Sequence, residues 1–576
     1  MDNPERVTYF AATDSRGKRI PFGIKSKDRS KHMYVIGKTG MGKSTLLENM
    51  AIQDIRNGEG LTFIDPHGGT ADKLLEYIPE HRIKDVVYFA PFDLDRPIAF
   101  NVMEDVGYDK RHLVVSGLMA TFKKIWEDAW SARMEYILTN TLLALLEYPD
   151  ATLLGVNRMY NDKGYRKKVV ENVKDPVVKD FWTKEFANYG ERYTQEATPA
   201  IQNKIGQFTG NPLIRNIIGQ SNSSFDIREM MDNRKILIIN LSKGLVGETN
   251  MRLLGSMLTT RIFLAAMSRA EFTQEKLHSL PNFYVYVDEF QNFANETFAE
   301  ILSEARKYNL NLIIAHQYIE QMEEEVRDAV FGNVGTTVTF RVGPFDAEVL
   351  ETVFTPEFLA PDIVNLGLRQ IYLSLMIDGI GSRPFSATTI PPIEAPARTF
   401  KQEVIEASRQ TYGAVREEIE TSVREVLVSE DPEEAAPAPR KLSPAQAYAT
   451  RPRQETPLPR QPSSEQRERP RKPRDDAAPR RDQPRPERVP APPKEKSAED
   501  LKAILRSTIA KAENEKSAKV EKKESGLRDA LKETVSHERP RSEPSQKKQE
   551  PVPQSLDRPV FEIPEETLRS IFKEDV

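Results

Sequence analysis

The sequence contains no cysteine among its 576 residues. That absence excludes disulfide bonds, zinc sites built on thiolates and cysteine nucleophiles, and it agrees with a reducing compartment. Long hydrophobic runs are also missing, because no segment approaches the roughly 18–20 apolar residues that a membrane-spanning helix requires. The charged N-terminus lacks the apolar stretch of a signal peptide. We therefore expect a cytoplasmic chain with no direct membrane span.

The chain carries little net charge, with 82 Lys and Arg against 87 Asp and Glu, a formal net charge of −5. This balance excludes a globally basic nucleic-acid binder, although it leaves room for a locally basic channel. Proline is unevenly distributed, because 25 of the 40 prolines follow Ile390. We therefore expect a folded part up to about residue 395 and a mostly disordered, Pro-rich and charged tail over 396–576.

The folded part alternates apolar, strand-like runs with helical segments. The predicted strands are 33–37, 61–66, 86–91, 235–241, 283–290, 310–317 and 336–343. The predicted helices are 43–56, 71–78, 249–269, 297–308 and 319–331, with a further helix at 401–428. This alternation predicts an α/β fold with a mostly parallel sheet. Runs at 7–12 and 20–25 predict an N-terminal hairpin, and 372–390 predicts a last hairpin that turns at Asp378-Gly379.

The strand signal disappears between residues 104 and 234, where helical periodicity dominates, as it does over 122–148. Trp126 and Trp130 have helical i, i+4 spacing, which is more typical of core residues than of base-stacking ones. The expected domains are an N-terminal β-hairpin packed on the core (1–31), the first part of the α/β domain (32–103), an all-α insertion (104–234), the second part of the α/β domain (235–395) and the tail (396–576).

Residues 37–44, GKTGMGKS, match the phosphate-loop pattern G-x-x-x-x-G-K-[ST] between a predicted strand and a predicted helix. The glycines let the backbone N–H groups wrap around phosphates, Lys43 reaches the β- and γ-phosphates, and the Ser44 hydroxyl ligates Mg²⁺. ATP and Mg²⁺ are therefore the expected cofactors. The expected nucleotide-binding residues are Gly37, Lys38, Thr39, Gly40, Met41, Gly42, Lys43, Ser44 and Thr45.

A second motif, FYVYVDEF at 283–290, is an apolar strand that ends in two carboxylates. Asp288 is expected to hold the Mg²⁺ shell together with Ser44, and Glu289 to orient and deprotonate the attacking water. Such a pair favours a hydrolysing motor over a switch GTPase or a kinase. Gln317 ends the next predicted strand, where its amide can report the presence of a γ-phosphate.

Two arginines are candidates for stabilising the transferring phosphoryl group from a neighbouring subunit. Arg306 follows the helix between the last two motifs, and Arg341 lies at the end of a strand. Either residue can instead form an ordinary surface ion pair, and Arg306 is the preferred candidate. Asp65, in FIDPHGG, is interpreted as a structural cap of the turn that follows its strand, with a role near the nucleotide as the alternative.

These motifs in this order resemble the coupling-protein ATPases of conjugation and type IV secretion, which belong to the FtsK–HerA superfamily of hexameric DNA motors. The resemblance covers about residues 20–395 and includes the helical insertion, which is similar to the all-alpha domain of that family. It implies a RecA-like P-loop ATPase core and a ring, of six subunits in that family, that translocates DNA. It also implies Lys43 and Ser44 as nucleotide and Mg²⁺ contacts, Asp288 and Glu289 as metal-coordinating and catalytic acids, Gln317 as sensor and Arg306 as the arginine given across the subunit interface.

The N-terminus departs from that family, whose conjugation-type members usually carry membrane helices ahead of the phosphate loop. Only 36 residues precede Gly37 here, and none of them forms an apolar span. Two alternatives follow: a membrane partner recruits the chain to the inner face of the membrane, or the chain is a soluble helicase-like translocase for DNA processing. A non-motor scaffold whose assembly is controlled by ATP is a third alternative.

The tail contains three similar short segments, at 501–506, 527–532 and 568–573. Each has a leucine, a basic residue and a pair of apolar residues, which suits short amphipathic helices that dock into a partner. Relaxosome or membrane-channel proteins are the expected partners of these segments, and chance similarity is the alternative. The Arg-rich run at 469–488 is interpreted as a solvated linker, with weak DNA-phosphate contacts as the alternative.

Overall fold

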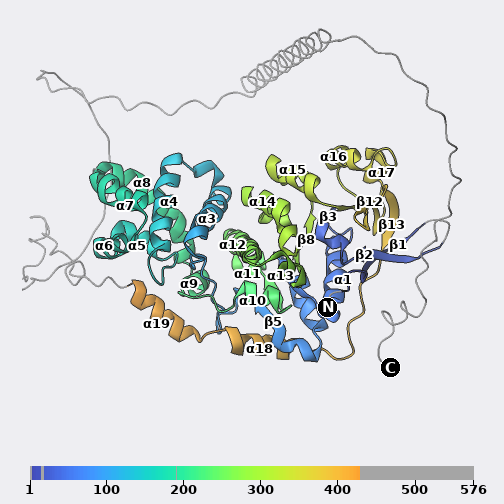
Figure 1. Cartoon of the computed structure of the whole chain (residues 1–576), viewed down its shortest axis with the longest axis horizontal. Helices are drawn as coiled ribbons and strands as arrows, with labels where there is room; N and C mark the ends of the chain where they lie inside the picture. The colour runs from blue at the N-terminus through green and yellow to red at the C-terminus, as the bar shows by residue number, and fades with distance from the viewer. Residues whose placement is uncertain (1–2, 15–17, 190, 428–576) are drawn as a thin grey trace, which may run out of the picture. The chain divides into compact units, whose positions relative to one another are not determined.

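The computed structural model describes residues 3–14, 18–189 and 191–427, and its central element is one eleven-stranded sheet (Figure 1). The strand order is β2-β1-β13-β10-β9-β3-β8-β7-β4-β6-β5, and β11 and β12 form a separate two-stranded sheet. The strands are β1 (Val7–Thr13), β2 (Pro21–Lys25), β3 (Met33–Ile36), β4 (Gly60–Asp65), β5 (Val86–Phe89), β6 (Ile236–Asn240), β7 (Phe283–Val287), β8 (Leu310–His316), β9 (Thr336–Thr339), β10 (Gln370–Ser374), β11 (Met376–Ile377), β12 (Ile380–Gly381) and β13 (Phe385–Thr389). The predicted α/β fold with a mostly parallel sheet is confirmed.

The sheet has a parallel and an antiparallel part. The seven strands from β9 to β5 are parallel to one another, whereas β10, β13, β1 and β2 continue the sheet in antiparallel pairs. The N-terminal hairpin therefore extends the sheet, because Ala11 of β1 lies opposite Thr389 of β13. The last hairpin turns at Asp378 and Gly379, both with positive φ, as predicted.

The parallel strands are buried on both faces, which explains their nearly continuous apolar sequences. In β7 the side chains of Phe283, Val285 and Val287 belong to one hydrophobic cluster, and Tyr284 and Tyr286 belong to the other. This alternation follows from the two-residue period of a strand. Helices α12, α14, α15 and α16 contribute to the first cluster, and α1, α2 and α18 contribute to the second.

The helices connect the strands and also form the long insertion between β5 and β6. They are α1 (Lys43–Arg56), α2 (Gly69–Leu74), α3 (Arg111–Ile125), α4 (Ala132–Leu146), α5 (Gly155–Asn161), α6 (Lys163–Asn172), α7 (Pro176–Asp180), α8 (Glu191–Thr209), α9 (Pro212–Ile218), α10 (Ile227–Asp232), α11 (Lys243–Val246), α12 (Glu248–Met267), α13 (Gln274–Ser279), α14 (Glu296–Glu304), α15 (Glu324–Asn333), α16 (Pro344–Phe354), α17 (Ala360–Val364), α18 (Lys401–Tyr412) and α19 (Arg416–Leu427). No helix of the described residues is both long and apolar enough to cross a membrane.

The helical periodicity predicted over 122–148 corresponds to parts of two helices, because α3 ends at Ile125 and α4 begins at Ala132. Ser131 caps α4, with its hydroxyl accepting a hydrogen bond from the Met134 N–H at 3.3 Å. The assumed helical spacing of Trp126 and Trp130 is therefore wrong, and both side chains are only partly buried against the core. The predicted helix at 319–331 begins later, at Glu324, after a short 3-10 turn.

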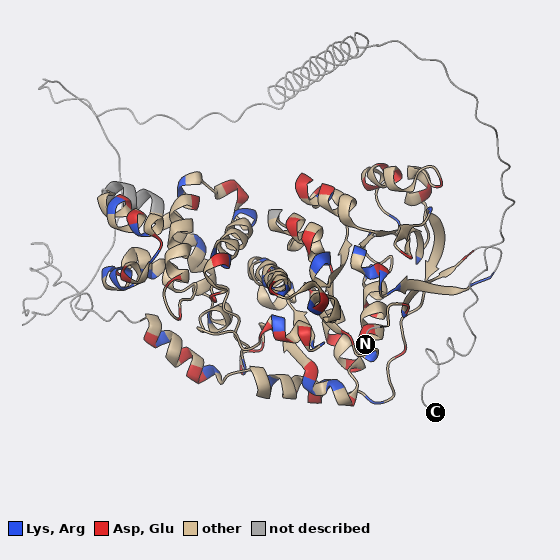
Figure 2. Ribbon diagram, viewed as in Figure 1, with Lys and Arg blue, Asp and Glu red and all other residues tan. Residues whose placement is uncertain are grey.

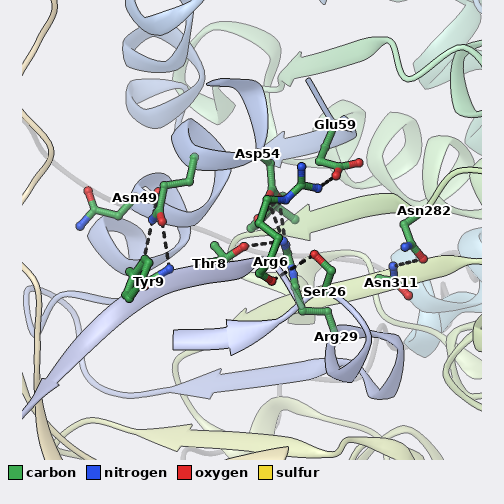
Figure 3. A network of polar contacts seen from close by, with 12 residues as sticks. Arg6, Thr8, Tyr9, Ser26, Arg29, Asn49, Asp54, Glu59, Asn282 and Asn311 are labelled. Atoms are coloured by element: carbon green, nitrogen blue, oxygen red, sulfur yellow. Dashed lines mark hydrogen bonds and ion pairs between the residues drawn. The ribbon is translucent and has the colours of Figure 1, made fainter. Parts of the chain in front are cut away.

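The N-terminal hairpin is joined to the rest of the sheet through a buried ion pair (Figure 3). The Arg29 guanidinium donates to both carboxylate oxygens of Asp54 at 2.7 and 2.8 Å and to the Tyr286 hydroxyl at 2.7 Å. It also donates to Thr8 of β1 at 3.1 Å and stacks 3.6 Å over the Tyr284 ring. This network links β1, α1 and β7.

The chain beyond β13 packs along the domain and onto the insertion. Helix α18 contacts β5, and its Ser408 hydroxyl accepts a hydrogen bond from the Tyr88 N–H at 2.9 Å. Helix α19 contacts α9, with Ile419 and Val423 buried against Leu154 of the insertion.

The helix predicted at 401–428 is thus two helices, which are separated at residues 413–415. The predictions for the Arg-rich run and for the three short tail segments lie outside the described residues.

Candidate nucleotide-binding site

The expected site residues meet at the carboxyl ends of the parallel strands, where open α/β sheets bind their ligands. The phosphate loop follows β3, and Asp288 and Glu289 follow β7. Gln317 follows β8, which pairs with β3 on one side and with β7 on the other. Residues separated by about half of the described chain are therefore only one or two strands apart.

The phosphate loop is tied to the strands on both sides of β3. The Gly37 N–H donates to the His316 carbonyl at 3.2 Å, and the Lys38 N–H donates to the Arg341 carbonyl at 2.9 Å. Gly37 also packs against Phe340, because a Cβ atom at this position would lie 2.5 Å from the Phe340 Cβ. Gly42 has a φ of 120°, a backbone conformation that residues other than glycine rarely adopt.

The first turn of α1 contains Lys43, Ser44 and Thr45. The Lys43 ammonium is buried and donates to the Gly37 carbonyl at 2.6 Å, which curls the lysine back over its own loop. Burial lowers the pKa of Lys43, and the nearby Glu289 and Asp288 carboxylates oppose that shift.

Ser44 and Asp288 are in direct contact, since the Ser44 hydroxyl donates to Asp288 Oδ2 at 2.8 Å. Burial raises the pKa of Asp288, an effect that the Ser44 hydrogen bond opposes and that Asp65 and Glu289 reinforce. The ionised form of Asp288 is therefore poorly compensated by the protein alone, and a nearby cation would stabilise it.

Glu289 adopts a left-handed backbone conformation, with φ 48° and ψ 48°. Its carbonyl accepts hydrogen bonds from both the backbone and the side-chain amide of Asn292, each at 3.0 Å. Its carboxylate accepts a hydrogen bond from the Gln291 side chain at 2.5 Å. A non-glycine residue in this conformation costs free energy, and such positions concentrate at functional sites.

Gln317 contacts the phosphate loop directly, because its side-chain amide donates to the Thr39 hydroxyl. His316, the residue before it, is fully buried, and burial lowers the pKa of His316 to about 3. Its Nδ1 lies 3.2 Å from the Tyr34 hydroxyl. These contacts suit a neutral, structural histidine beside an exchangeable contact of Gln317 with the loop.

Arg306 is not at this edge of the sheet. It lies in the 3-10 turn Ala305–Tyr308, before the start of β8, whereas Gln317 follows the end of that strand. A seven-residue strand spans about 20 Å. The Arg306 side chain is exposed, and no ion pair or hydrogen bond of its guanidinium occurs among the described residues. Arg306 therefore cannot reach the phosphate loop of the same chain.

Arg341 and Asp65 lie beside the site. The Arg341 carbonyl accepts from Lys38, so this residue flanks its own phosphate loop. Asp65 accepts hydrogen bonds from the N–H groups of His67, Thr70 and Ala71 at 2.8–2.9 Å. The capping interpretation of Asp65 is confirmed by these three bonds.

The structure brings two residues to the site that sequence reasoning missed. The Arg369 N–H donates to the Met41 carbonyl at 3.3 Å, and Arg369 itself has a positive φ of 62°. Gln291 holds the Glu289 carboxylate, as described above. Arg369 is brought there by the antiparallel strand β10, which no local pattern indicates, whereas Gln291 is adjacent to the acid pair and could have been proposed from its position.

The site fits a nucleotide and a divalent cation. The loop has glycines with positive φ and a buried Lys43. At Gly37 it packs so closely against Phe340 that a larger residue would not fit. Mg²⁺ is usually held by one or two side chains together with phosphate oxygens and water. Ser44 and Asp288 would supply those side chains, and the described residues contain no separate cluster of three or more His, Asp or Glu suited to a metal.

The sequence matches one family of known proteins. A family model described as the type IV secretion-system coupling protein DNA-binding domain matches residues 18–351, more than half of the chain. No curated protein gives a significant match.

Several solved structures are similar at low sequence identity. Plasmid coupling protein TrwB with a non-hydrolysable GTP analogue is 15% identical, with a TM-score of 0.48, and the match covers 69% of this chain and 91% of that chain. TrwB with ADP and Mg²⁺ is 14% identical, with a TM-score of 0.49 and coverage of 69% and 98%. VirB4 of Thermoanaerobacter pseudethanolicus is 14% identical, with a TM-score of 0.45 and coverage of 69% and 98%.

Proposed function

The chain belongs to the family of type IV secretion-system coupling proteins that carry this DNA-binding domain, and from that membership we propose that it is an ATPase that moves DNA. The observation that carries the proposal is the convergence of Lys43, Ser44, Asp288, Glu289 and Gln317 at one edge of the sheet. Those residues provide a phosphate loop, a cation site, a proton acceptor and a sensor, which together suit hydrolysis rather than binding alone.

The chain's own groups would divide the work as follows. Backbone N–H groups of residues 37–45 and the Lys43 ammonium would hold the phosphates, and Ser44 and Asp288 would hold the cation. ATP with Mg²⁺ supplies the bond that is hydrolysed and neutralises phosphate charge. Glu289 would accept the proton of the attacking water. Gln317 would exchange its contact with Thr39 for one to the γ-phosphate.

The DNA would be contacted by a local basic surface, because the insertion as a whole is neutral. Residues 104–234 contain 18 Lys and Arg and 18 Asp and Glu, and both kinds are interspersed over these helices in Figure 2. The densest basic group lies on α6, where Lys163 and Lys167 are exposed. Phosphate contacts of this kind weaken steeply with salt.

We further propose that the active form is a ring, a hexamer, with each nucleotide between two subunits. The support is the position of Arg306, which is exposed, lies at the opposite edge of the sheet from its own phosphate loop and so is placed to serve a neighbour. Tail residues beyond 427 would bind relaxosome or membrane-channel proteins, which would bring the cytoplasmic chain to the inner face of the membrane.

The experiment that tests the proposal is a steady-state ATPase assay with no DNA, single-stranded DNA or double-stranded DNA, each at low and near-physiological salt. A Lys43→Met variant controls for contaminating ATPases, because it removes the buried phosphate contact. Stimulation by either form of DNA, weaker at near-physiological than at low salt, supports the DNA motor and identifies its substrate. Hydrolysis without any DNA effect in confirmed rings would refute DNA as the cargo, and no hydrolysis would refute the ATPase.

A further inference from the structure

Lys124 is a partly buried lysine in the last turn of α3, the first long helix of the insertion. Helix α3 packs on α12 and α14 of the ATPase domain and on α4 of the insertion, and it lies between these two groups of helices in Figure 1. The Lys124 side chain makes polar contacts with two separate segments of the ATPase domain, both of which begin at proposed catalytic residues. Lys124 therefore connects the helical insertion, to which it belongs, with both of these segments of the ATPase domain.

The first segment runs from Glu289 to Asn295. It is a compact turn, because the Phe293 and Ala294 N–H groups both donate to the Phe290 carbonyl at 2.9 Å. Its first residue holds the carboxylate proposed to activate water, and the Lys124 ammonium donates to the Ala294 carbonyl near its end. A shift of Lys124 is therefore transmitted to Glu289 through five residues with little internal freedom.

The second segment runs from Gln317 to Glu323. It contains the 3-10 turn Ile319–Gln321, and the Ile319 N–H is held by Asp346 at 2.8 Å. Its first residue is the proposed sensor, and the carboxylate at its end lies 3.6 Å from the Lys124 ammonium. A change in the contacts of Gln317 thus reaches Lys124 along a second short, hydrogen-bonded path.

On the other side, the end of α3 packs against the interior of the insertion. The Phe122 ring stacks on Phe208 of α8 at 6.1 Å between centroids, and the Trp126 ring lies 5.4 Å from the same phenylalanine. These two aromatic residues flank Lys124 in the sequence. Movement of α8 relative to the sheet therefore displaces the lysine.

We propose that Lys124 couples DNA binding by the helical insertion to the catalytic and sensor segments of the ATPase site. The proposal rests on the proposed function, because it assigns a route by which the DNA and nucleotide sites communicate. Lys124 is a positioning residue: it contacts neither phosphate nor DNA in this role, and it acts through the Ala294 carbonyl and the Glu323 carboxylate.

The charge of Lys124 favours two discrete arrangements of α3 and the two segments over a gradual change in their positions. Burial lowers the pKa of Lys124, and the Glu323 carboxylate opposes that shift. A partly buried ammonium that loses one of its two acceptors is poorly solvated, so the helix and both segments are favoured to move together. Coupling of this kind is a free energy between two sites and is reciprocal.

The test measures coupling as a ratio, the Kd for DNA without nucleotide divided by the Kd with a non-hydrolysable ATP analogue. Coupling factors of about 5–150-fold, in either direction, are typical of allosteric proteins. We expect Lys124→Met to bring the ratio close to one and Lys124→Arg to restore most of it. Glu323→Gln, a milder change at a half-exposed site, should bring the ratio part of the way toward one.

The matched control is Lys110→Met. Lys110 lies just before the other end of α3 and pairs with Glu271 of the ATPase domain at 2.8 Å, but it contacts neither segment. This variant should keep the wild-type ratio. A wild-type ratio in Lys124→Met would overturn the inference, as would an equal loss in Lys110→Met.

Hydrogen exchange separates this inference from the proposed function. In Lys124→Met without ligands, amides of residues 290–295 and 318–323 should exchange faster than in wild type, while those of α1 should not. If the wild-type chain does not bind DNA, the proposed DNA motor fails, and the exchange rates still decide whether Lys124 holds both segments. If it binds DNA but the ratio is one, the inference fails. Unchanged exchange in both segments would overturn the inference.

Discussion

Replacing Glu289 by glutamine should stop ATP hydrolysis while leaving ATP binding intact. The substitution conserves size, and the left-handed backbone at this position is held by the two Asn292 donors to the Glu289 carbonyl rather than by the side chain. The phosphate loop and Lys43 make no hydrogen bond with the Glu289 carboxylate among the described residues. The change is therefore confined to the group proposed to accept the proton of water.

The expected loss of rate is that of a missing general base, because the substitution changes only this group. A positioned general base contributes typically 10²–10⁴-fold in rate, which corresponds to about 3–5 kcal/mol of barrier. The Gln291 amide, which donates to this carboxylate, can still donate to the glutamine oxygen, so little stability should be lost. We expect kcat to fall by about 10²–10⁴-fold with an unchanged Kd for nucleotide.

The assay combines phosphate release under steady-state conditions with titration of a fluorescent ATP analogue. Glu320→Gln is the matched control, because Glu320 is an exposed acid at the same edge of the sheet, three residues beyond Gln317. It should hydrolyse at the wild-type rate. A Glu289→Gln enzyme that retains more than about a tenth of the wild-type kcat would refute the assignment of Glu289 as base, and a lost nucleotide affinity would refute its confinement to chemistry.

Three further results are expected. Arg306→Ala subunits and Glu289→Gln subunits should each be inactive alone yet recover ATPase activity when mixed, because some interfaces then contain an intact pair; no recovery in rings shown to be mixed would refute a trans arginine. Asp54→Asn should lower the free energy of unfolding by about 3–5 kcal/mol, since it leaves the Arg29 charge buried without its carboxylate; a urea titration with a loss below about 1 kcal/mol would contradict this. Deleting residues 428–576 should spare DNA-stimulated ATPase activity but abolish DNA transfer between cells, and an equal loss of ATPase activity would instead make the tail part of the motor.

Much of the fold was predictable because its signals are local. Strand β7 is predictable because five apolar or aromatic residues are followed directly by two acids. The phosphate loop is predictable because few other structures require its sequence. The boundary between α3 and α4 was not predicted, although a local signal for it exists. Ser131 is an N-cap residue, and its preference for that position was outweighed by the apolar periodicity on both sides.

Other features could not be predicted, because they depend on how distant segments pack. The approach of Arg369 to Met41 requires β10 to return antiparallel to β9, and the contacts of Lys124 require α3 to lie on α12 and α14. The separation of Arg306 from its own phosphate loop likewise follows from the direction of β8. The motif identified Arg306 as a candidate, but only the sheet determines that it cannot act in its own subunit.

The packing of the insertion constrains how the proposed motor can work. Apolar residues of α3, α4 and α8 belong to the same hydrophobic cluster as α12 and one face of the sheet. Rotating the whole insertion away from the sheet would expose this shared core, at a cost of about 25 cal/mol per Å² of apolar surface. Small displacements of α3 that keep its contacts with α12 and α14 leave this core buried. The proposed nucleotide site therefore has an inexpensive route to the helical insertion through the end of α3, where Lys124 contacts both the segment after Glu289 and the segment after Gln317. A swing of the insertion as a rigid body offers no comparable route.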